Sequence, residues 1–340
     1  MNPQENICAR LAGRISSSSS ELQAARGCLV GGMVGDAAGA VLEFRRYYDE
    51  DHVRVAMTMP GGGLLAVGPG QITDDSELML ALLHGLRGSH PSAFPAEAVA
   101  QRYIDWLQSR PFDMGNTTRL AFSARSPSEV PVLAAQLNTG SEANGALMRA
   151  APIALWCVKH NMPYTTVAAH ARADSRLSHS SKVCQDANAV FCVALAHLLQ
   201  HLGDYKGAIQ QAEMLISTDD VHPTVAAWME DSKSMAISSR KCVPNIGHAK
   251  HAFTLAMHLL RNSNDYSYED AIFKVLTLGG DTDTNACICG YVMGALRGLD
   301  GIPEYMRRPV LEFDSSKIPP GGQGHLRPDT YKAIHAMDLL

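Results

Sequence analysis

The chain has 340 residues, 46% of them hydrophobic and 19% charged, which is enough to bury a sizeable core. A net charge of −5 without any run of basic residues argues against a nucleic-acid partner. Eight cysteines without a C-x-x-C pair, no apolar run near about 18 residues and no signal-like N-terminus lead us to expect a reduced, cytoplasmic protein without a membrane span.

The first 20 residues are polar and end in five serines, which predicts a flexible arm, with a partner-binding segment as the alternative. From Glu21 onwards, apolar residues recur at three- and four-residue steps, a pattern typical of helices. The clearest runs are 99–107, 147–158, 187–199, 249–260 and 271–278. Because alternating runs are few and no βαβ rhythm or repeat is present, we predict one compact all-α domain over residues 21–310. A loop and a short helix are expected over 311–340.

Two of the predicted helices carry a glycine at every fourth position. These glycines are Gly27, Gly31, Gly35 and Gly39 in the first helix, and Gly290, Gly294 and Gly298 in the second. Each costs about 1 kcal/mol of helix stability relative to alanine, and a four-residue spacing places them on one face. We therefore predict a close helix–helix contact at the centre of the bundle. Asp36, within the first helix, is expected to be a hydrogen-bonded core carboxylate rather than a metal ligand.

Residues 58–70 contain five glycines and two prolines, which excludes a helix. We expect a loop that either closes over a substrate or merely connects two helices. It leads directly into Thr73-Asp74-Asp75, at the start of the next helical pattern.

A second acidic cluster, Asp281-Thr282-Asp283-Thr284, follows two glycines and precedes the apolar run 286–299. Capping a helix needs one such residue, not four. Closely spaced oxygen ligands suit Mg²⁺, Mn²⁺ or Ca²⁺ better than zinc or copper. Because one short segment cannot surround two cations about 3.5–4 Å apart, we predict that the two clusters are halves of one dinuclear metal site.

Two other segments have weaker signals. Residues 141–149 are expected to open a helix whose positive end could hold a phosphate, assisted by Arg149. His248 and His251 have a spacing that could bind zinc, but no glutamate follows the first histidine and the pattern is that of an amphipathic helix. Surface or core histidines are the preferred interpretation.

Taken together, seven segments in order along residues 26–303 resemble the ADP-ribosylglycohydrolase family, and most of all its arginine-specific bacterial branch. They are Gly35–Gly39 with Glu43, 61–63, 70–75, 106–118, 144–149, 177–179 and 279–284. The resemblance implies an all-helical fold with two Mg²⁺ or Mn²⁺ ions at its centre. In two places the chain departs from the family pattern: Ser178 replaces a frequent threonine, and a tyrosine expected near the adenine or ribose is replaced around His248.

The resemblance also implies roles for individual residues. The metal ligands would be Thr73, Asp74, Asp75, Asp281, Asp283 and Thr284. The substrate-binding residues would be Gly115, Asn116, Thr117, Asn144, Gly145 and His179. The catalytic residues would be Glu43, Asp113 and Asp281, with the general acid/base work assigned to Glu43 or Asp113 without a choice between them.

The implied reaction is metal-dependent hydrolysis of the N-glycosidic bond between ADP-ribose and a protein arginine, which releases ADP-ribose from a mono-ADP-ribosylated protein. Such cleavage passes through an oxocarbenium-like state and needs an acid to protonate the leaving group. Opening of the ribose ring with the help of Asp113 is a variant route. Serine-linked or O-acetyl-ADP-ribose substrates are alternatives. So is an immunity protein whose N-terminal arm also blocks an ADP-ribosylating toxin. A catalytically silent member is disfavoured because no candidate ligand is replaced.

Overall fold

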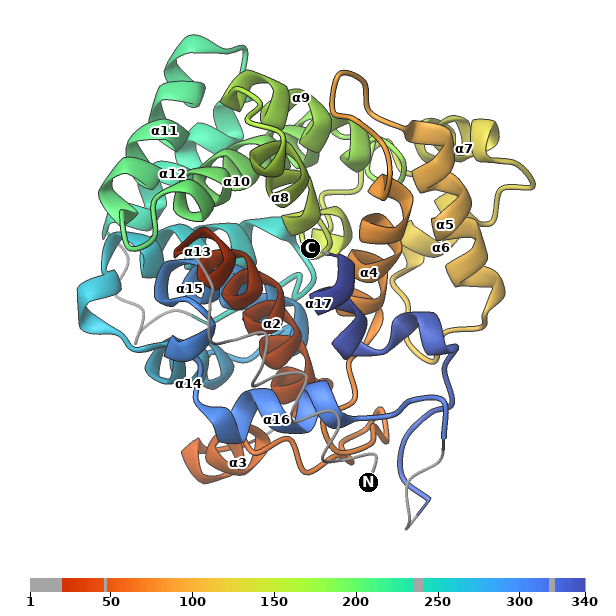
Figure 1. Ribbon diagram of the computed structural model, residues 1–340, viewed down its shortest axis with the longest axis vertical. Helices are drawn as coiled ribbons and strands as arrows, with labels where there is room; N and C mark the ends of the chain where they lie inside the picture. Colours follow the sequence, from red (N-terminus) through yellow and green to blue (C-terminus); the bar gives the residue numbers. More distant parts are fainter. Residues whose placement is uncertain (1–19, 46–47, 235–240, 318–321, 340) are drawn as a thin grey trace.

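A computed structural model describes residues 20–45, 48–234, 241–317 and 322–339, and in these ranges the regular elements are all helical. The α-helices are α2 (Ser20–Ala40), α3 (Glu50–Ala56), α4 (Asp74–Leu86), α5 (Ala96–Gln108), α6 (Asn116–Phe122), α7 (Val130–Leu137), α8 (Ala151–Lys159), α9 (Tyr164–Ser175), α10 (Lys182–Gln200), α11 (Tyr205–Thr218), α12 (Pro223–Ser234), α13 (Ala249–Arg261), α14 (Tyr268–Thr277), α15 (Thr282–Arg297), α16 (Glu304–Glu312) and α17 (Ala336–Leu339). The 3-10 turns are η1 (Pro127–Glu129), η2 (Asn144–Ala146), η4 (Ser263–Asp265), η5 (Leu299–Gly301), η6 (Asp329–Tyr331) and η7 (Ala333–His335). The predicted all-α fold is confirmed (Figure 1). The predicted N-terminal arm, with its toxin-binding alternative, falls almost entirely on residues 1–19, outside the described ranges.

Helices α2 and α15 pack against each other at the centre of the molecule, as the glycine spacing predicts. A side chain at Gly27 would overlap the backbone of Gly294, and one at Gly290 would overlap the backbone of Gly31. The contact continues to the end of α2, where Gly39 lies against the backbone of Asp283. The hydroxyl of Thr282 donates to the Gly39 carbonyl at 2.9 Å. This contact therefore brings the end of α2 against the first turn of α15.

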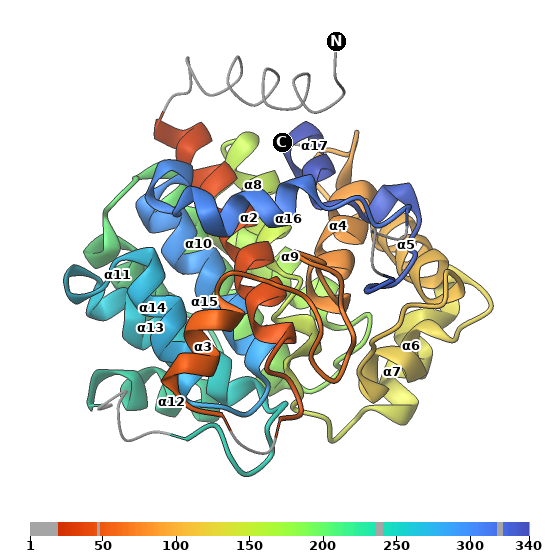
Figure 2. The ribbon, with the colours of Figure 1, turned by 90° about the horizontal axis from the view of Figure 1, so that it is seen from below.

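The other helices surround this pair. On one side α5, α6 and α7 lie beyond α4, and on the other side α10 packs against α8, α9, α11 and α15 (Figures 1 and 2). By length and composition α10 could cross a membrane, but 89% of its apolar window is buried inside the protein. It serves as a core helix.

Two segments differ from the sequence expectation. The helix expected to open within 141–149 begins only at Ala151, after the turn η2, because Pro152 has no N–H to donate and suits a first helical turn. In the tail, the short helix expected within 311–340 is divided into η6, η7 and the short α17. The tail packs back onto α4 and α16 (Figure 1).

Candidate metal and substrate site

The first acidic cluster stands at the start of α4 and is held in place by Asp36 of α2. The Asp36 carboxylate accepts hydrogen bonds from the backbone N–H and hydroxyl of Thr73, the latter at 2.8 Å. It also accepts from the N–H and hydroxyl of Ser76. Burial raises its pKa to about 6, although these hydrogen bonds act in the opposite direction. Asp36 is thus a hydrogen-bonded core carboxylate, as predicted.

The second cluster reaches the first through Asp75. One carboxylate oxygen of Asp75 accepts from the Thr284 hydroxyl at 3.3 Å and lies at the same distance from the Thr73 hydroxyl, which donates to Asp36. Thr284 lies in the first turn of α15, for which Asp281 is the N-cap residue. The fold therefore brings together two clusters that are about 200 residues apart in the sequence.

Carboxylates from four segments form two overlapping triplets. Ligand atoms of Asp36, Asp75 and Asp283 lie within 4.8 Å of one another, and the same holds for Glu43, Asp113 and Asp283. Asp283 belongs to both triplets. From the sequence we did not expect Asp36 to be a metal ligand. In the structure it lies beside the predicted ligands Asp75 and Asp283, because α2 and α15 approach each other so closely.

The electrostatics of this cluster favour a bound cation. Burial first, and then neighbouring carboxylates, raise the pKa of Asp74, Asp75 and Asp283 well above the usual value. Burial, followed by the charge of Asp113, raises the pKa of Glu43 to about 8. Glu43 can share a hydrogen bond with Asp283, and Asp74 can share one with Asp113. Two carboxylates share a hydrogen bond only when one is protonated, so a cation would remove that need.

Two observations fit the residues to hard divalent cations. The Oδ1 atom of Asp75 and the Oε2 atom of Glu43 are buried and have no hydrogen-bond partner. The donors at the site are carboxylate and hydroxyl oxygens, which suit Mg²⁺ or Mn²⁺. Buried oxygens without partners are costly, and coordination would satisfy them.

Above the cluster lies a cleft of about 270 Å³. The predicted substrate residues that line it are Gly115, Asn116, Thr117, Asn144, Gly145 and His179. It is also lined by Glu43, Asp113 and four predicted metal ligands, Asp74, Asp281, Asp283 and Thr284. The predicted ligands Thr73 and Asp75 are not part of this lining. The cleft thus exposes part of the acidic cluster to a bound molecule.

Two of the cleft residues have defined polar partners. The side-chain N–H₂ of Asn144 donates to Asp281 at 2.8 Å, so a predicted substrate-binding residue orients a predicted metal ligand. The Nδ1 atom of His179 lies 2.8 Å from the Ser178 hydroxyl, and its Nε2 atom is buried without a partner. Burial, with a smaller effect of Arg149, lowers the His179 pKa to about 3. The imidazole is therefore neutral at physiological pH.

Arg149 does not face the cleft, contrary to the sequence expectation. It is fully buried, its Nε atom lies 3.1 Å from the Asp174 carboxylate, and it also donates to the hydroxyl of Tyr103. Its Nη1 atom donates to the Gly145 carbonyl at 2.9 Å. Because its donors are engaged inside the core, Arg149 fixes the backbone of a cleft residue and is not available to a phosphate.

The histidine pair also has structural partners. His248 caps α13 and lies 3.2 Å from Glu142, and His251 contacts the Pro244 carbonyl at 3.1 Å. The two rings are nearly perpendicular, with centroids 6.5 Å apart. This arrangement agrees with the preferred interpretation of surface histidines.

Sequence reasoning missed two apolar residues at the cleft. Phe44, which is 53% exposed, follows Glu43 directly, and Ile246 precedes α13 on a loop held by a hydrogen bond from Asn144 to the Gly247 carbonyl. The position of Phe44 beside Glu43 was a usable signal. Nothing local in the sequence indicates that Ile246 reaches the cleft.

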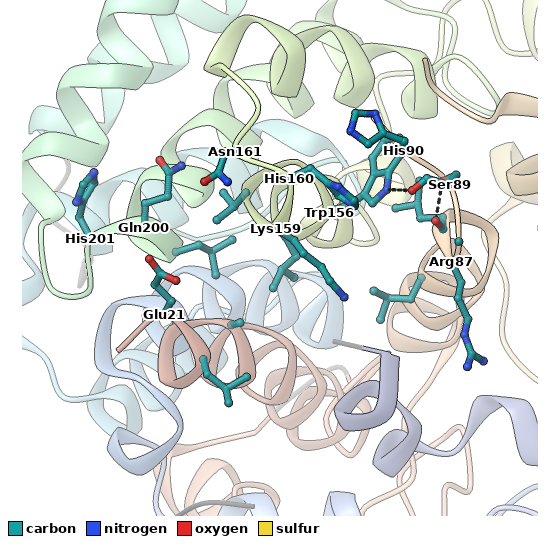
Figure 3. A pocket seen from close by; sticks show the side chains of 18 residues that line it. Glu21, Arg87, Ser89, His90, Trp156, Lys159, His160, Asn161, Gln200 and His201 are labelled. Carbon is teal, nitrogen blue, oxygen red and sulfur yellow. Dashed lines mark hydrogen bonds between the residues drawn. The ribbon is translucent and has the colours of Figure 1, made fainter. Parts of the chain in front are cut away.

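A larger cavity, of about 1110 Å³, lies between the N-terminal end of α2 and the C-terminal ends of α4, α8 and α10 (Figure 3). Its described lining includes Arg87, Lys159 and Trp156 and no member of either acidic cluster. Size alone therefore does not locate the chemistry. The smaller cleft holds the titratable groups that can act on a substrate.

Comparisons with known proteins identify the family of the chain. A family model described as ADP-ribosylglycohydrolase matches residues 17–327. The chain is 29% identical to the ADP-ribosyl-[dinitrogen reductase] glycohydrolase of Rhodospirillum rubrum over 82% of this chain and 87% of that one. It is 28% identical to the ADP-ribosylarginine hydrolase Tri1 of Serratia proteamaculans, covering 84% of this chain and 75% of that one. It is 24% identical to the ADP-ribosylhydrolase ARH3 of Mus musculus, covering 89% and 91%.

One solved structure, described as an ADP-ribosylglycohydrolase-related protein complex, has the same fold. It superposes with a TM-score of 0.67, at 24% identity, over 94% of this chain and 97% of that chain.

Proposed function

Because the chain belongs to the ADP-ribosylglycohydrolase family, we propose that it hydrolyses the N-glycosidic bond between ADP-ribose and an arginine side chain of a modified protein. The observation that carries this proposal is the pair of overlapping carboxylate triplets beneath a cleft. The preference for arginine is supported by the similarity to relatives named for ADP-ribosylarginine and for ADP-ribosyl-dinitrogen reductase.

The same residues would hold two Mg²⁺ or Mn²⁺ ions. Their ligands would be Thr73, Asp74, Asp75, Asp281, Asp283 and Thr284. Bound ions of this kind orient a sugar substrate and supply an activated water. The buried, unpartnered oxygen of Asp75 supports this assignment.

The chain's own groups supply the remaining chemistry. Cleavage at the distal ribose develops positive charge on the sugar, and the carboxylates beneath the cleft stabilise that charge. The leaving nitrogen must be protonated. Glu43 and Asp113 both line the cleft, so either is placed to hold the proton that is transferred.

The walls of the cleft orient the substrate. Neutral His179 presents Nε2 as a hydrogen-bonding atom, while Asn144 keeps Asp281 in place. Gly115, Asn116 and Thr117 line the same cleft and would contact the diphosphate or the ribose.

The deciding experiment measures ADP-ribose released from an ADP-ribosylarginine protein, with Mg²⁺ or Mn²⁺ and with a chelator. We expect metal-dependent release that Asp281→Asn abolishes. The matched control is Asp265→Asn, at an exposed aspartate in η4, which should behave as the wild type.

The other outcomes separate the levels of the proposal. Release only from serine-linked or O-acetyl-ADP-ribose would overturn the arginine assignment and leave the hydrolase. If none of these substrates is cleaved in the presence of either metal, the proposed hydrolase activity is wrong.

A further inference from the structure

The C-terminal tail returns to the candidate site through four residues, Gly324–Arg327. The N–H of Gly324 donates to the carbonyl of Ala66. The side-chain amide of Gln71 makes two hydrogen bonds with the backbone of His325: it donates to the carbonyl at 2.8 Å and accepts from the N–H at 2.9 Å. The Nε2 atom of His325 lies 2.7 Å from the Leu65 carbonyl, so that nitrogen carries the hydrogen. These contacts hold the glycine-rich loop, which ends three residues before Thr73.

The same histidine supports the loop that carries Asp113. Its ring stacks on Phe112, with centroids 4.1 Å apart and planes inclined by 10°. Phe112 immediately precedes Asp113, and Arg110 in the same loop has a positive φ of 56°. A backbone in this region is costly for a residue with a side chain and persists where its surroundings hold it.

Arg327 provides the third attachment. Its guanidinium binds both carboxylate oxygens of Glu77, each at 2.8 Å, and both the carbonyl and the hydroxyl of Ser109. The Trp106 indole N–H also donates to Glu77 at 2.8 Å. Arg327 is only 4% exposed. It therefore joins Glu77 in the first turns of α4, two residues after Asp75, to Ser109 at the start of the loop that follows α5.

We propose that Gly324–Arg327 is a strap that positions the candidate site, with His325 and Arg327 as its positioning residues. Each attachment lies within two residues of a predicted ligand or catalytic residue: Gln71 before Thr73, Glu77 after Asp75 and Phe112 before Asp113. Groups that hydrogen-bond directly to metal ligands commonly change metal affinity about 10–100-fold when they are replaced, and the strap acts on residues next to such ligands in the sequence. The inference rests on the proposed function, because that function identifies the residues being positioned.

Figure 1 shows why the tail can act in this way. After α16, the chain runs past α4 and α5 before it ends in α17, which packs against α4. The strap therefore touches both the loop that leads to Thr73 and the loop that leads to Asp113.

The test measures two properties of the full-length wild type and of each variant. They are the Mn²⁺ affinity, by calorimetry, and the rate of amide hydrogen exchange in residues 60–71 and 109–115. His325→Ala removes the ring stack and the bond to Leu65, whereas His325→Phe retains the stack. Arg327→Met is combined with Glu77→Gln so that no unpaired carboxylate is buried. The control is Arg308→Met, which breaks an exposed pair with Glu312 on α16.

We expect His325→Ala and the double variant to bind Mn²⁺ about 10–100-fold more weakly and to exchange faster in both loops. His325→Phe should lie between His325→Ala and the wild type, and Arg308→Met should match the wild type. If His325→Ala loses thermal stability while the folded protein keeps wild-type Mn²⁺ affinity and loop exchange, the tail is only structural and the proposal is wrong. A wild type that binds Mn²⁺ but releases no ADP-ribose would instead overturn the proposed function and leave the strap intact.

Discussion

Removal of divalent metal should make the stability of the protein fall steeply as the pH rises, and Glu43 allows the effect to be worked out. Its carboxyl is 6% exposed, and burial followed by the charge of Asp113 raises its pKa from 4.5 to about 8. The folded state then holds this proton more tightly than the unfolded state. The contribution to stability is therefore complete below pH 4.5 and is lost as the pH rises through about 8.

The size of the loss follows from the two pKa values. At 1.36 kcal/mol per pH unit, the interval from 4.5 to about 8 corresponds to at most about 5 kcal/mol. This is an upper limit because Asp113 and the other carboxylates share the protons of the cluster. It is still a large part of the roughly 5–15 kcal/mol that stabilises a typical domain.

The assay is urea unfolding in a chelator at several pH values from 5 to 8.5, repeated with excess Mg²⁺. We expect the free energy of unfolding to fall with pH in the chelator and to change much less with Mg²⁺, since the cation takes the place of the protons. Glu43→Gln should be more stable than the wild type at pH 8.5 without metal, and it should lose hydrolytic activity. A pH-independent metal-free wild type, or a Glu43→Gln variant without this gain, would refute the reasoning.

Two further predictions concern the frame around the site. Gly290→Ala should lower the free energy of unfolding by about 3 kcal/mol, because the new carbon would overlap backbone atoms of α2. The control Gly140→Ala adds a carbon with nothing within 4 Å and should change that free energy by less than about 0.5 kcal/mol. Equal effects of the two substitutions in urea unfolding would contradict the close contact between α2 and α15. Arg149→Met should cost about 3–5 kcal/mol, because it leaves the Asp174 carboxylate buried without its ion-pair partner. Arg149→Met combined with Asp174→Asn should recover part of that loss, and a double variant no more stable than the single one would disprove this account.

The sequence predicted those features that depend on local spacing or on a shared chemical requirement. Glycines at every fourth position predicted the contact between α2 and α15, because only a side-chain-free face allows that approach. We predicted that the two Thr/Asp clusters lie together, because neither alone could surround a pair of cations. In the structure they meet at Asp75, which accepts a hydrogen bond from Thr284.

Features that depend on the tertiary environment could not be predicted from the sequence. Arg149 stands in a plausible anion-binding segment, and only the fold reveals that Asp174 and Tyr103 already occupy its donors. The tail had no recognisable signal either. Its role depends on His325 meeting Phe112, more than 200 residues earlier in the chain, and no periodicity in the sequence reports such a contact.

The central helix contact and the acidic cluster depend on each other. A side chain at Gly39 would overlap the backbone of Asp283 and displace the first turn of α15. That turn carries Thr284, whose hydroxyl bonds to Asp75, so the displacement would separate the two clusters. Close helix packing thus forces carboxylates together that repel one another without a cation. We therefore expect the fold to be most stable when a cation occupies the site, which would couple metal binding to the stability of the whole domain.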